Sequence, residues 1–557
     1  MKNMSRNSYG FALPIVIITS GALIVLMLAL LQSVVSMRTF TNFSYYSKLA
    51  EESAEAGTIY AAACIEANGR MPSWGTNTLT ETKDCFGVQQ TAFVTSTSSA
   101  DIHFNIGAVS VTPSSVNIQA AGRANIPGLS SPLIGNLSRS ITWDTDTTST
   151  KSASGTSRTC GILSGNVYCW GDNTYGQLGN NLTIDSLTPV KVYKETGILS
   201  GKEVSNMFAA QDHNCAIAEG EVYCWGRNNY GQLGDGTTTN RSKPVKVSGA
   251  LAGKTVTAVG GTQHTSCAIA ESKIYCWGSN LYGVVGKNST ATSTTSFTTP
   301  TIVATAADGV SSGLSATYAA TKLTSGSRAT NMCAIADGKA YCWGKNQAGQ
   351  IGNNVAPSST TYRAPVAVYS AGVLSGKTVT SISLDGYSDD PASPNPPPYT
   401  HVCVVANDAV YCWGENNSGQ LGNASTTDTR APIATSTSGV LSGKTIIDVV
   451  AGISHSCALS SIGKVYCWGS NASGQIGDNT STTRTSPVAV YEEAGALLNV
   501  TVTTIAGGAN RGCATANGKS FCWGLNSDGQ IGDGTTTNRR KPTESTFMRP
   551  KNDDFVY

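Results

Sequence analysis

The chain has 557 residues, more than the ~100–200 of a typical domain, so two or more packed units are expected. Charged residues make up 13% of the sequence and the formal net charge is +2, which argues against a basic surface for nucleic acid. The 59 glycines, and the Ser, Thr and Asn residues between short apolar runs, predict a mainly β, turn-rich protein.

Residues 11–37 form the most apolar segment of the chain and contain no charged residue. A helix of this length covers about 40 Å, which exceeds the ~30 Å hydrocarbon core of a bilayer. Lys2 and Arg6 precede the segment, so the positive-inside bias places the N-terminus in the cytoplasm and the rest outside. We expect a single transmembrane helix rather than a secretory signal peptide, whose apolar region would be shorter.

The junction SRNSYG-FALP places a short basic leader ending in Gly10 before Phe11, which opens the apolar run. It resembles the class III signal of type IV pilins, and the resemblance implies cleavage between Gly10 and Phe11 by a prepilin peptidase. Apolar and small residues from Tyr46 to Ala61 follow the helical spacing of an amphipathic stalk. The expected parts are a leader (1–10), a transmembrane helix with stalk (11–66) and a small α+β pilin-like head (67–146). An uncleaved signal anchor with a spacer is the alternative.

One residue departs from the pilin pattern. Pilins usually carry Glu at the fifth mature position, where it neutralises the terminal ammonium of a neighbouring subunit, and Ile15 occupies that position here. Because an uncompensated buried ammonium is costly, this subunit should dock poorly beneath another. The omission is similar to that of minor pilins and pseudopilins that cap filaments.

Two stretches within the predicted head alternate apolar and polar residues, as half-buried strands do. Cys64 and Cys85 flank a polar loop between the stalk and these strands, and we interpret them as a disulfide. The alternating apolar positions are Ile102, Phe104 and Ile106, then Val116, Ile118 and Ala120.

A unit of about fifty residues occurs seven times in the remainder of the chain. It reads Cys, eight residues, Cys-Trp-Gly-x-Asn-x-x-Gly-Gln-Leu/Ile-Gly, then a Thr-rich turn, Pro and a short apolar strand. The third unit has Val284 in place of the Gln. The Trp positions are Trp170, Trp225, Trp277, Trp343, Trp413, Trp468 and Trp523.

This unit closely resembles the regulator-of-chromosome-condensation repeat. The resemblance implies a seven-bladed β-propeller over residues 147–546, with one four-stranded blade per unit, followed by a tail of residues 547–557. Whether residues 147–155 or 545–557 lend a strand that closes the ring is left open. Within each unit we expect Trp to fill the space between blades, and Asn and Gln to satisfy backbone groups of the loops.

Fourteen of the sixteen cysteines fall in pairs within the repeats. Most pairs are centred on a dipeptide such as Glu219-Gly220, typical of a two-residue hairpin turn with positive φ. In such a hairpin the two Cys oppose each other at a non-hydrogen-bonded position, with Cα atoms ~4.5 Å apart and within disulfide range. The sixth unit has one extra residue, and its turn Ser461-Ile462-Gly463 becomes a three-residue loop that preserves the register.

We therefore predict one cross-strand disulfide in each blade. So many paired cysteines favour an oxidising compartment, whereas reduced thiols that pack as small hydrophobes are the alternative. The predicted pairs are Cys160–Cys169, Cys215–Cys224, Cys267–Cys276, Cys333–Cys342, Cys403–Cys412, Cys457–Cys467 and Cys513–Cys522.

Recognition could reside in loops that interrupt or vary the repeat. Three insertions do so, at 288–299, 304–328 and 385–400, and loops on a rigid scaffold commonly bind partners. The residue before the middle Gly of the unit is Tyr in three adjacent repeats, which would form an aromatic arc. Solvated loops without a partner, and rings that only cover the next blade, are the alternatives. The candidate binding residues are Tyr175, Tyr230, Tyr282, Tyr387 and Tyr399.

No metal, cofactor or catalytic activity is expected. His213, His264, His401 and His455 each precede a repeat Cys, where symmetry would hold them on separate blades. The Asp-Gly-Thr-Thr-Thr-Asn loops lack the acidic density of a calcium loop, which favours turn capping. A nucleophile elbow, a phosphate loop and a metal signature are all missing from the sequence.

The expected function is that of an exported cell-surface binding protein, a minor type IV pilin whose propeller serves as an adhesin or recognition head. Its partners would be other pilin subunits through the N-terminal helix, and an extracellular protein or glycan through the propeller, but not nucleic acid. It would lie in the cell membrane with its C-terminal domains outside, or in an extracellular pilus after cleavage. The alternative is a membrane-anchored propeller that binds or inhibits another extracellular protein without pilus assembly.

Overall fold

The computed structural model divides the chain into two compact units, residues 1–145 with 548–557, and residues 146–547. The predicted leader, transmembrane helix, stalk and Cys64–Cys85 disulfide lie outside the residues that the structure describes. Within the described ranges, no helix has the length and apolar character needed to cross a bilayer. Those ranges are 79–80, 101–111, 115–125, 133–142, 149–193, 198–288, 296–308, 313–324, 326–356, 361–387, 399–436, 439–492 and 497–545.

The first unit contains an antiparallel sheet in the order β1-β2-β3-β4. Both predicted alternating stretches are strands, and they pair with each other, with Ile106 opposite Ala120 and Val111 opposite Val116. The two strands are therefore confirmed, while the pilin-like identity of the sheet stays a prediction. The strands are β1 (Leu79–Thr80), β2 (Asp101–Val111), β3 (Ser115–Asn125) and β4 (Leu133–Thr142).

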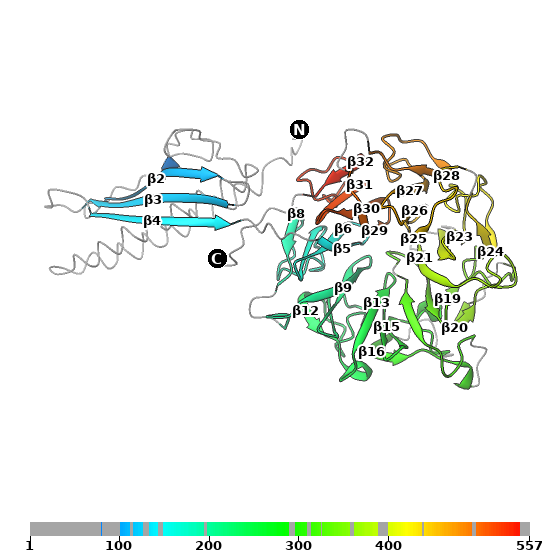
Figure 1. Cartoon of the computed structure of the whole chain (residues 1–557). Helices are drawn as coiled ribbons and strands as arrows, with labels where there is room; N and C mark the ends of the chain where they lie inside the picture. The colour runs from blue at the N-terminus through cyan, green and yellow to red at the C-terminus, as the bar shows by residue number, and fades with distance from the viewer. Residues whose placement is uncertain are drawn as a thin grey trace, which may run out of the picture. The chain divides into compact units, whose positions relative to one another are not determined.

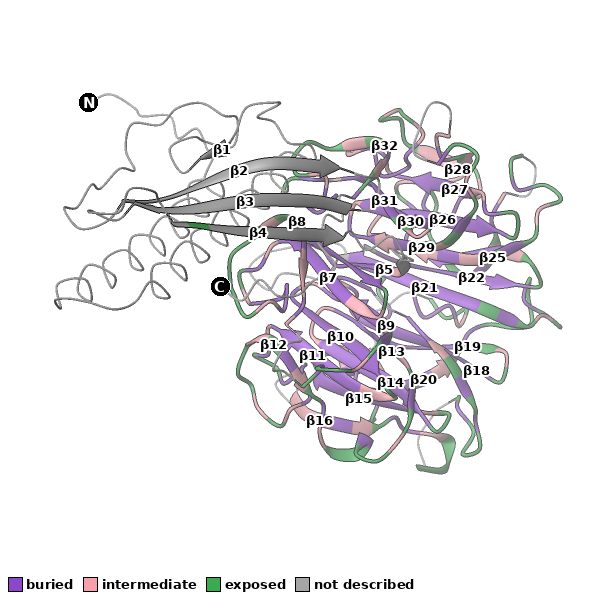
Figure 2. Ribbon diagram, turned by 60° about the vertical axis from the view of Figure 1, so that its left-hand side comes forward, coloured by how far each residue is buried: buried purple, intermediate pink, exposed green. Residues whose placement is uncertain are grey.

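The second unit is a ring of seven four-stranded antiparallel sheets, or blades, each built from four consecutive strands (Figure 1). The first strands of neighbouring blades contact each other all round the ring, β29 with β5 included, so they surround the propeller axis. The second and third strands of the blades are largely buried, whereas half-buried and exposed residues lie on the fourth strands and in the loops (Figure 2). This confirms the predicted seven-bladed fold.

Short 3₁₀ segments lie at η1 (Gly249–Leu251), η2 (Leu281–Gly283) and η3 (Ala306–Asp308). The blades follow one another in chain order. Blade 1 holds β5 (Ser149–Ser154), β6 (Arg158–Leu163), β7 (Asn166–Gly171) and β8 (Ser186–Lys191). Blade 2 holds β9 (Val204–Ala209), β10 (His213–Ala218), β11 (Glu221–Gly226) and β12 (Arg241–Lys246). Blade 3 holds β13 (Val256–Gly261), β14 (Thr265–Ala270), β15 (Lys273–Ser279) and β16 (Ser296–Ile302). Blade 4 holds β17 (Ala320–Leu323), β18 (Asn331–Ala336), β19 (Lys339–Lys345) and β20 (Thr361–Ala367). Blade 5 holds β21 (Val379–Tyr387), β22 (Tyr399–Ala406), β23 (Ala409–Gly414) and β24 (Thr429–Ala434). Blade 6 holds β25 (Ile446–Ala451), β26 (His455–Ser460), β27 (Val465–Gly469) and β28 (Arg484–Ala489). Blade 7 holds β29 (Val502–Gly508), β30 (Arg511–Ala516), β31 (Lys519–Gly524) and β32 (Arg539–Glu544).

A tight hairpin joins the second and third strands of each blade and carries the predicted disulfide. At the turn of blade 2, Glu219 and Gly220 have φ of 51° and 76°, as a primed two-residue turn requires. Cys215 then opposes Cys224, and their Cα atoms lie 4.1 Å apart. In blade 6, Gly463 takes φ of 75° and the longer loop keeps the same register. All seven predicted disulfides are present, with Cα separations of 4.0–4.1 Å.

Each repeat Trp joins its blade to the preceding one. The Trp225 indole, fully buried, donates a 3.0 Å hydrogen bond to the main-chain oxygen of Gln177 in blade 1. The same bond recurs at every interface and spans 2.7–3.0 Å, with Val284 supplying the oxygen where the Gln is missing. The last Gly of the unit packs on this ring, and a Cβ on Gly179 would lie 2.7 Å from the Trp225 indole. The predicted role of Trp between blades is thereby confirmed.

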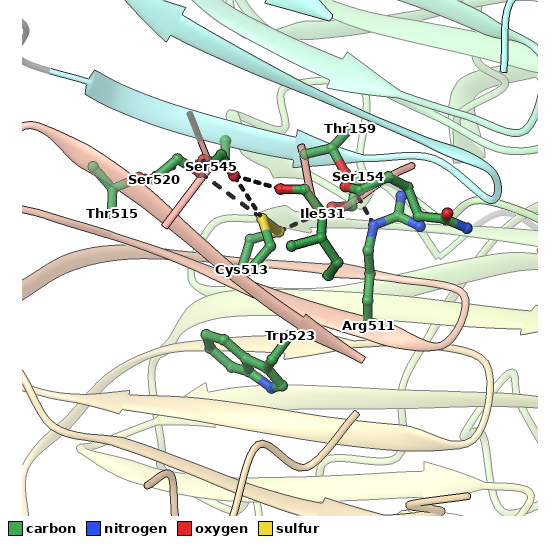
Figure 3. Close-up of a disulfide and its surroundings, with 12 residues drawn as sticks. Ser154, Thr159, Arg511, Cys513, Thr515, Ser520, Trp523, Ile531 and Ser545 are labelled. Atoms are coloured by element: carbon green, nitrogen blue, oxygen red, sulfur yellow. Dashed lines mark hydrogen bonds between the residues drawn. A yellow bond between two sulfur atoms is a disulfide. The ribbon is translucent and has the colours of Figure 1, made fainter. Parts of the chain in front are cut away.

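Blade 7 closes on blade 1 through side chains, because every blade uses only its own four strands in the described part of the chain. Arg511 is fully buried and donates to the Thr159 hydroxyl at 3.0 Å and to the main-chain oxygens of Thr156 and Gly155 at 2.9 and 2.6 Å (Figure 3). Trp170 adds its indole bond to Gln530 at 2.9 Å. No blade borrows a closing strand in the described part of the chain. Residues 149–154 form the first strand of blade 1 and pair with no strand of another blade.

Replacing Arg511 with Met should weaken this closure, because buried oxygens of blade 1 lose their donor. We expect the free energy of unfolding to fall by about 2–5 kcal/mol, measured by urea denaturation followed by Trp fluorescence. The matched control is Arg540→Met, at an exposed position of the same blade, which should change stability by less than about 0.5 kcal/mol. Equal effects of the two substitutions would contradict the closing role of Arg511.

Candidate functional site

Three predicted Tyr residues lie on the loops that follow the third strands of blades 1, 2 and 3, and we call them the Tyr arc (Tyr175, Tyr230 and Tyr282). Each ring packs on a side chain of the next blade. Arg227 lies 4.8 Å from the Tyr175 ring centre, His264 lies 4.7 Å from that of Tyr230, and Lys345 lies 4.7 Å from that of Tyr282. Covering the neighbouring blade is therefore one role of the arc, yet Tyr230 keeps 38% of its surface exposed.

Tyr387 and Tyr399 oppose each other in blade 5, at the ends of β21 and β22. They lie in blade 5, where the insertion at 385–400 places them, whereas the Tyr arc lies on blades 1, 2 and 3. Their side chains, and the Pro-rich segment between them, lie outside the described residues.

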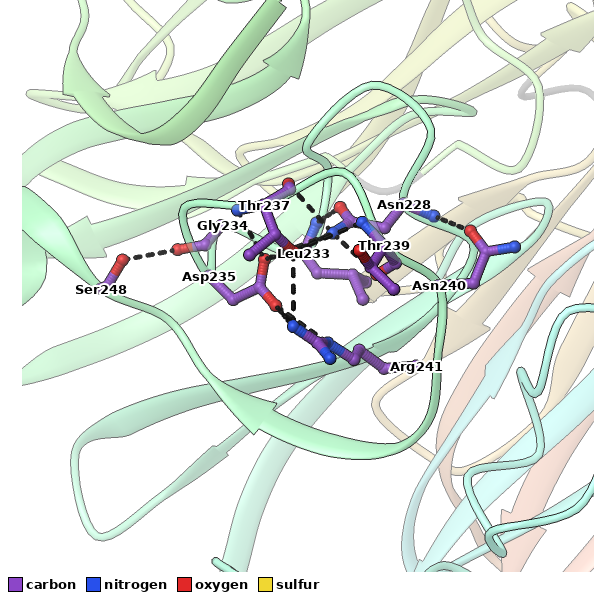
Figure 4. Close-up of polar contacts among 9 residues, drawn as sticks. All are labelled: Asn228, Leu233, Gly234, Asp235, Thr237, Thr239, Asn240, Arg241 and Ser248. Carbon is purple, nitrogen blue, oxygen red and sulfur yellow. Dashed lines mark hydrogen bonds and ion pairs between the residues drawn. The ribbon is translucent and has the colours of Figure 1, made fainter.

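The polar residues that recur in the loops of successive repeats hold these loops together. Asn228 accepts the Leu233 amide at 2.9 Å, and its own amide group donates to the main-chain oxygens of Thr237 and Thr239 at 3.1 Å (Figure 4). Asp235 accepts the Thr237 amide at 3.0 Å and pairs with Arg241 at 2.8 Å. The carboxylate oxygens already have donors, which agrees with turn capping rather than calcium binding.

The four predicted His residues sit at separate blade interfaces. His401 is buried, and its Nε2 lies 2.7 Å from the Ser456 hydroxyl of the next blade. Ser456 donates to the Gln420 main-chain oxygen, so His401 is the donor in this contact. His213 makes the equivalent contact to Ser266 at 2.8 Å. Within the described ranges, no three His, Cys, Asp or Glu side chains gather as metal ligands would.

Burial controls the protonation of these imidazoles. Desolvation, and then the nearby His455, lower the pKa of His401 to about 3. Desolvation is also the main reason why the pKa of His455 falls to about 4. Both rings are therefore neutral in the folded protein at pH 7, in keeping with structural hydrogen bonds between blades.

A second set of residues of functional interest surrounds the propeller axis. The sequence alone did not indicate these residues. Each first strand has a register shift near its start, and the residue next to this shift lies at an equivalent place in every blade. These positions vary from blade to blade and so carry no repeat signal. We call them the axial ring: Lys151, Asn206, Ala258, Lys322, Ser381, Asp448 and Thr504.

The axial ring is polar and links blades that are not neighbours. Lys322 of blade 4 donates to Ser381 of blade 5 at 2.7 Å and to Asp448 of blade 6 at 3.1 Å. Ser381 also donates to Asp448 at 2.5 Å. Lys151 of blade 1 donates to Asn206 of blade 2, and burial together with the charge of Lys322 lowers the pKa of Lys151 to about 8. These side chains can make such contacts because they lie close together around the propeller axis.

Comparison with known proteins agrees with this geometry. The family model of the regulator of chromosome condensation (RCC1) repeat matches five segments that begin within the second unit, and a second RCC1 repeat model matches residues 446–475. The second unit is an RCC1-repeat seven-bladed β-propeller. The five matched segments are 164–217, 219–268, 407–459, 463–514 and 517–556.

Relatives of this propeller are found in several eukaryotes. The chain is 26% identical to the ultraviolet-B receptor UVR8 of Arabidopsis thaliana over 396 residues, which cover 70% of this chain and 80% of UVR8. It is also 26% identical to the human E3 ubiquitin-protein ligase HERC2, over 68% of this chain but only 7% of HERC2. The match therefore concerns only a small part of HERC2.

Two solved structures share the fold. Human WBSCR16 has a TM-score of 0.54 at 17% identity, over 69% of this chain and 91% of WBSCR16. Prp20p of Saccharomyces cerevisiae has a TM-score of 0.54 at 19% identity, over 72% of this chain and 88% of Prp20p. At these identities the likeness concerns the fold alone.

Acid should destabilise the propeller through its buried His residues. A His with a pKa of about 6.5 when unfolded and about 3 when folded contributes stability above pH 6.5, which is lost as the pH falls. At pH 5 the loss is about 2 kcal/mol for such a residue. We expect His401→Gln, which keeps a donor for Ser456, to show a smaller loss of stability between pH 7 and pH 5 in urea titrations. An unchanged pH dependence in this variant would contradict the assignment.

Proposed function

We propose that this chain is an exported binding protein that displays a rigid propeller at the cell surface. The observation that carries the proposal is the disulfide in every blade, buried and cross-strand. Seven disulfides of this kind suit an oxidising compartment and would not persist in a reducing cytosol. Export also agrees with the apolar segment 11–37, which precedes all of the cysteines.

The N-terminal sequence supports a more specific proposal, that of a minor type IV pilin. The Gly10-Phe11 junction supplies the cleavage site, and Ile15 in place of the usual Glu suits a subunit at the tip of a filament rather than within it. The propeller would then serve as the adhesin or recognition head.

The Tyr arc and the insertion loops are the surface that we propose for recognition. Tyr230 is the arc residue with the most exposed ring, and its contact with His264 holds the ring in place before any partner binds. Among proteins of this fold, the yeast RCC1 protein Prp20 is known in a solved structure bound to Kap60. That complex shows that a protein with this fold can bind another protein, and here we propose an extracellular partner.

The pilin proposal is tested at the mature N-terminus. Mass spectrometry of the protein from its native host should find the chain beginning at Phe11, with an N-methylated residue. The Gly10→Ala variant is the matched control and should retain the leader. An intact leader in the unmodified chain would remove the pilin proposal and leave a membrane-anchored propeller that binds or inhibits another extracellular protein.

The recognition proposal is tested with the full chain on arrays of extracellular proteins and glycans. For any partner found, Tyr230→Ala should weaken binding by about tenfold or more, because exposed aromatic anchors dominate such interfaces. Ser473→Ala, at the equivalent loop position of blade 6, is the matched control and should leave the affinity within about twofold. Equal effects of the two substitutions would contradict recognition by the Tyr arc.

A further inference from the structure

The axial ring carries more positive than negative charge. Its charged members are Lys151, Lys322 and Asp448, two ammonium groups and one carboxylate. Asp448 is already engaged by Lys322 and by the Ser381 hydroxyl. In the described part of the chain no ion pair joins Lys151 to a carboxylate, and its hydrogen-bond partner is the neutral Asn206.

The sector of the ring around Lys151 also holds an unused hydroxyl. Thr504 occupies the equivalent place on β29, the first strand next to β5, and its buried Oγ1 has no hydrogen-bond partner. Asn206, on the other side of Lys151, is held by the Met207 amide, which donates to Asn206 Oδ1 at 2.8 Å. An ammonium has three donors, so Lys151 keeps capacity for a further acceptor after it binds Asn206.

Solvent reaches the axial ring. The side chains of Lys322 and Asp448 are 40% and 31% exposed, and Lys151 and Thr504 are each half-buried. The ring lies at the end of the blades where the second strand turns into the third, since Lys151 opposes Ile162 close to the Ser164-Gly165 turn. The Tyr arc lies at the other end of the same blades, so the two surfaces are distinct.

We propose that the axial ring is a binding site for a carboxylate group, which Lys151 and Thr504 hold by hydrogen bonds. A carboxylate would neutralise the excess charge and satisfy the Thr504 hydroxyl at once. A charge-assisted hydrogen bond from an ammonium to a carboxylate is stronger than a neutral one. A single negative charge matches the single uncompensated positive charge of the ring. The site is independent of export, of the pilin-like segment and of the Tyr arc.

The test compares N-acetylglycine, which carries a carboxylate, with N-acetylglycinamide, its neutral counterpart, at pH 7 and constant ionic strength. Thermal unfolding of the full chain in detergent micelles reports binding, because a ligand of the folded state raises the melting temperature. N-acetylglycine should raise the melting temperature in a saturable way, and the amide should not. Equal effects of the two compounds, or no effect of either, would overturn the proposal.

Variants locate the site. Lys151→Met and Thr504→Val should each weaken the apparent affinity for N-acetylglycine, by about tenfold or more for Lys151→Met and by a smaller factor for Thr504→Val. Lys339→Met is the matched control, since it removes a positive charge at an exposed position of β19, and its affinity should stay within about twofold. Asp448→Asn removes the competing carboxylate and should tighten binding. Undiminished binding by both Lys151→Met and Thr504→Val, or weaker binding by Asp448→Asn, would contradict the assignment.

Discussion

The tight hairpin between the second and third strands of each blade is the constraint on which the propeller depends. Its two central residues take positive φ, which sets the register of the two strands and brings the cysteines face to face. Trp225 follows Cys224, and successive side chains of a strand point to opposite faces. The disulfide of a blade therefore faces the next blade, while its Trp faces the preceding one. Among the described residues, six interface cores pair the two, as where Cys160 and Cys169 cluster with Trp225.

Repetition of this interface makes the ring rigid, and the exceptions to the repetition give it individual surfaces. The structural positions, such as Trp225 and Asn228, recur in every blade, whereas the Tyr arc occupies a loop position that holds Ser418 and Ser473 in blades 5 and 6. The axial ring likewise varies from blade to blade, and only Lys151 and Lys322 share a residue type. Arg511 donates across the junction between blades 7 and 1, and each of these blades keeps its own four strands.

Much of the propeller could be predicted from the sequence because its determinants are local. The spacing of Cys215 and Cys224 around Glu219-Gly220 contains the hairpin, its register and the disulfide together. The roles of Trp and Asn followed from the same recurring unit. The insertion at 385–400 precedes the fifth repeat Trp in the sequence, and Tyr387 accordingly lies in blade 5.

The closure and the axial ring could not be predicted, because they join residues that only the closed ring brings together. Arg511 and Thr159 are 352 positions apart, and although Arg511 occupies the same repeat position as Arg158 and His401, only the closed ring shows that it meets blade 1. Lys322 meets Asp448 across the axis for the same reason. The sequence does give one indication, because the residues of the axial ring are variable and partly charged within otherwise regular strands. Only the closed ring shows that these residues meet at the axis.

The most direct measurement for the closed, disulfide-bonded ring is peptide mapping of the native protein by mass spectrometry, after alkylation of free thiols and digestion without reduction. We expect the fourteen propeller cysteines to escape alkylation and to be recovered as pairs within single blades, such as Cys513 with Cys522. Alkylated propeller cysteines, or disulfides that join different blades, would contradict it.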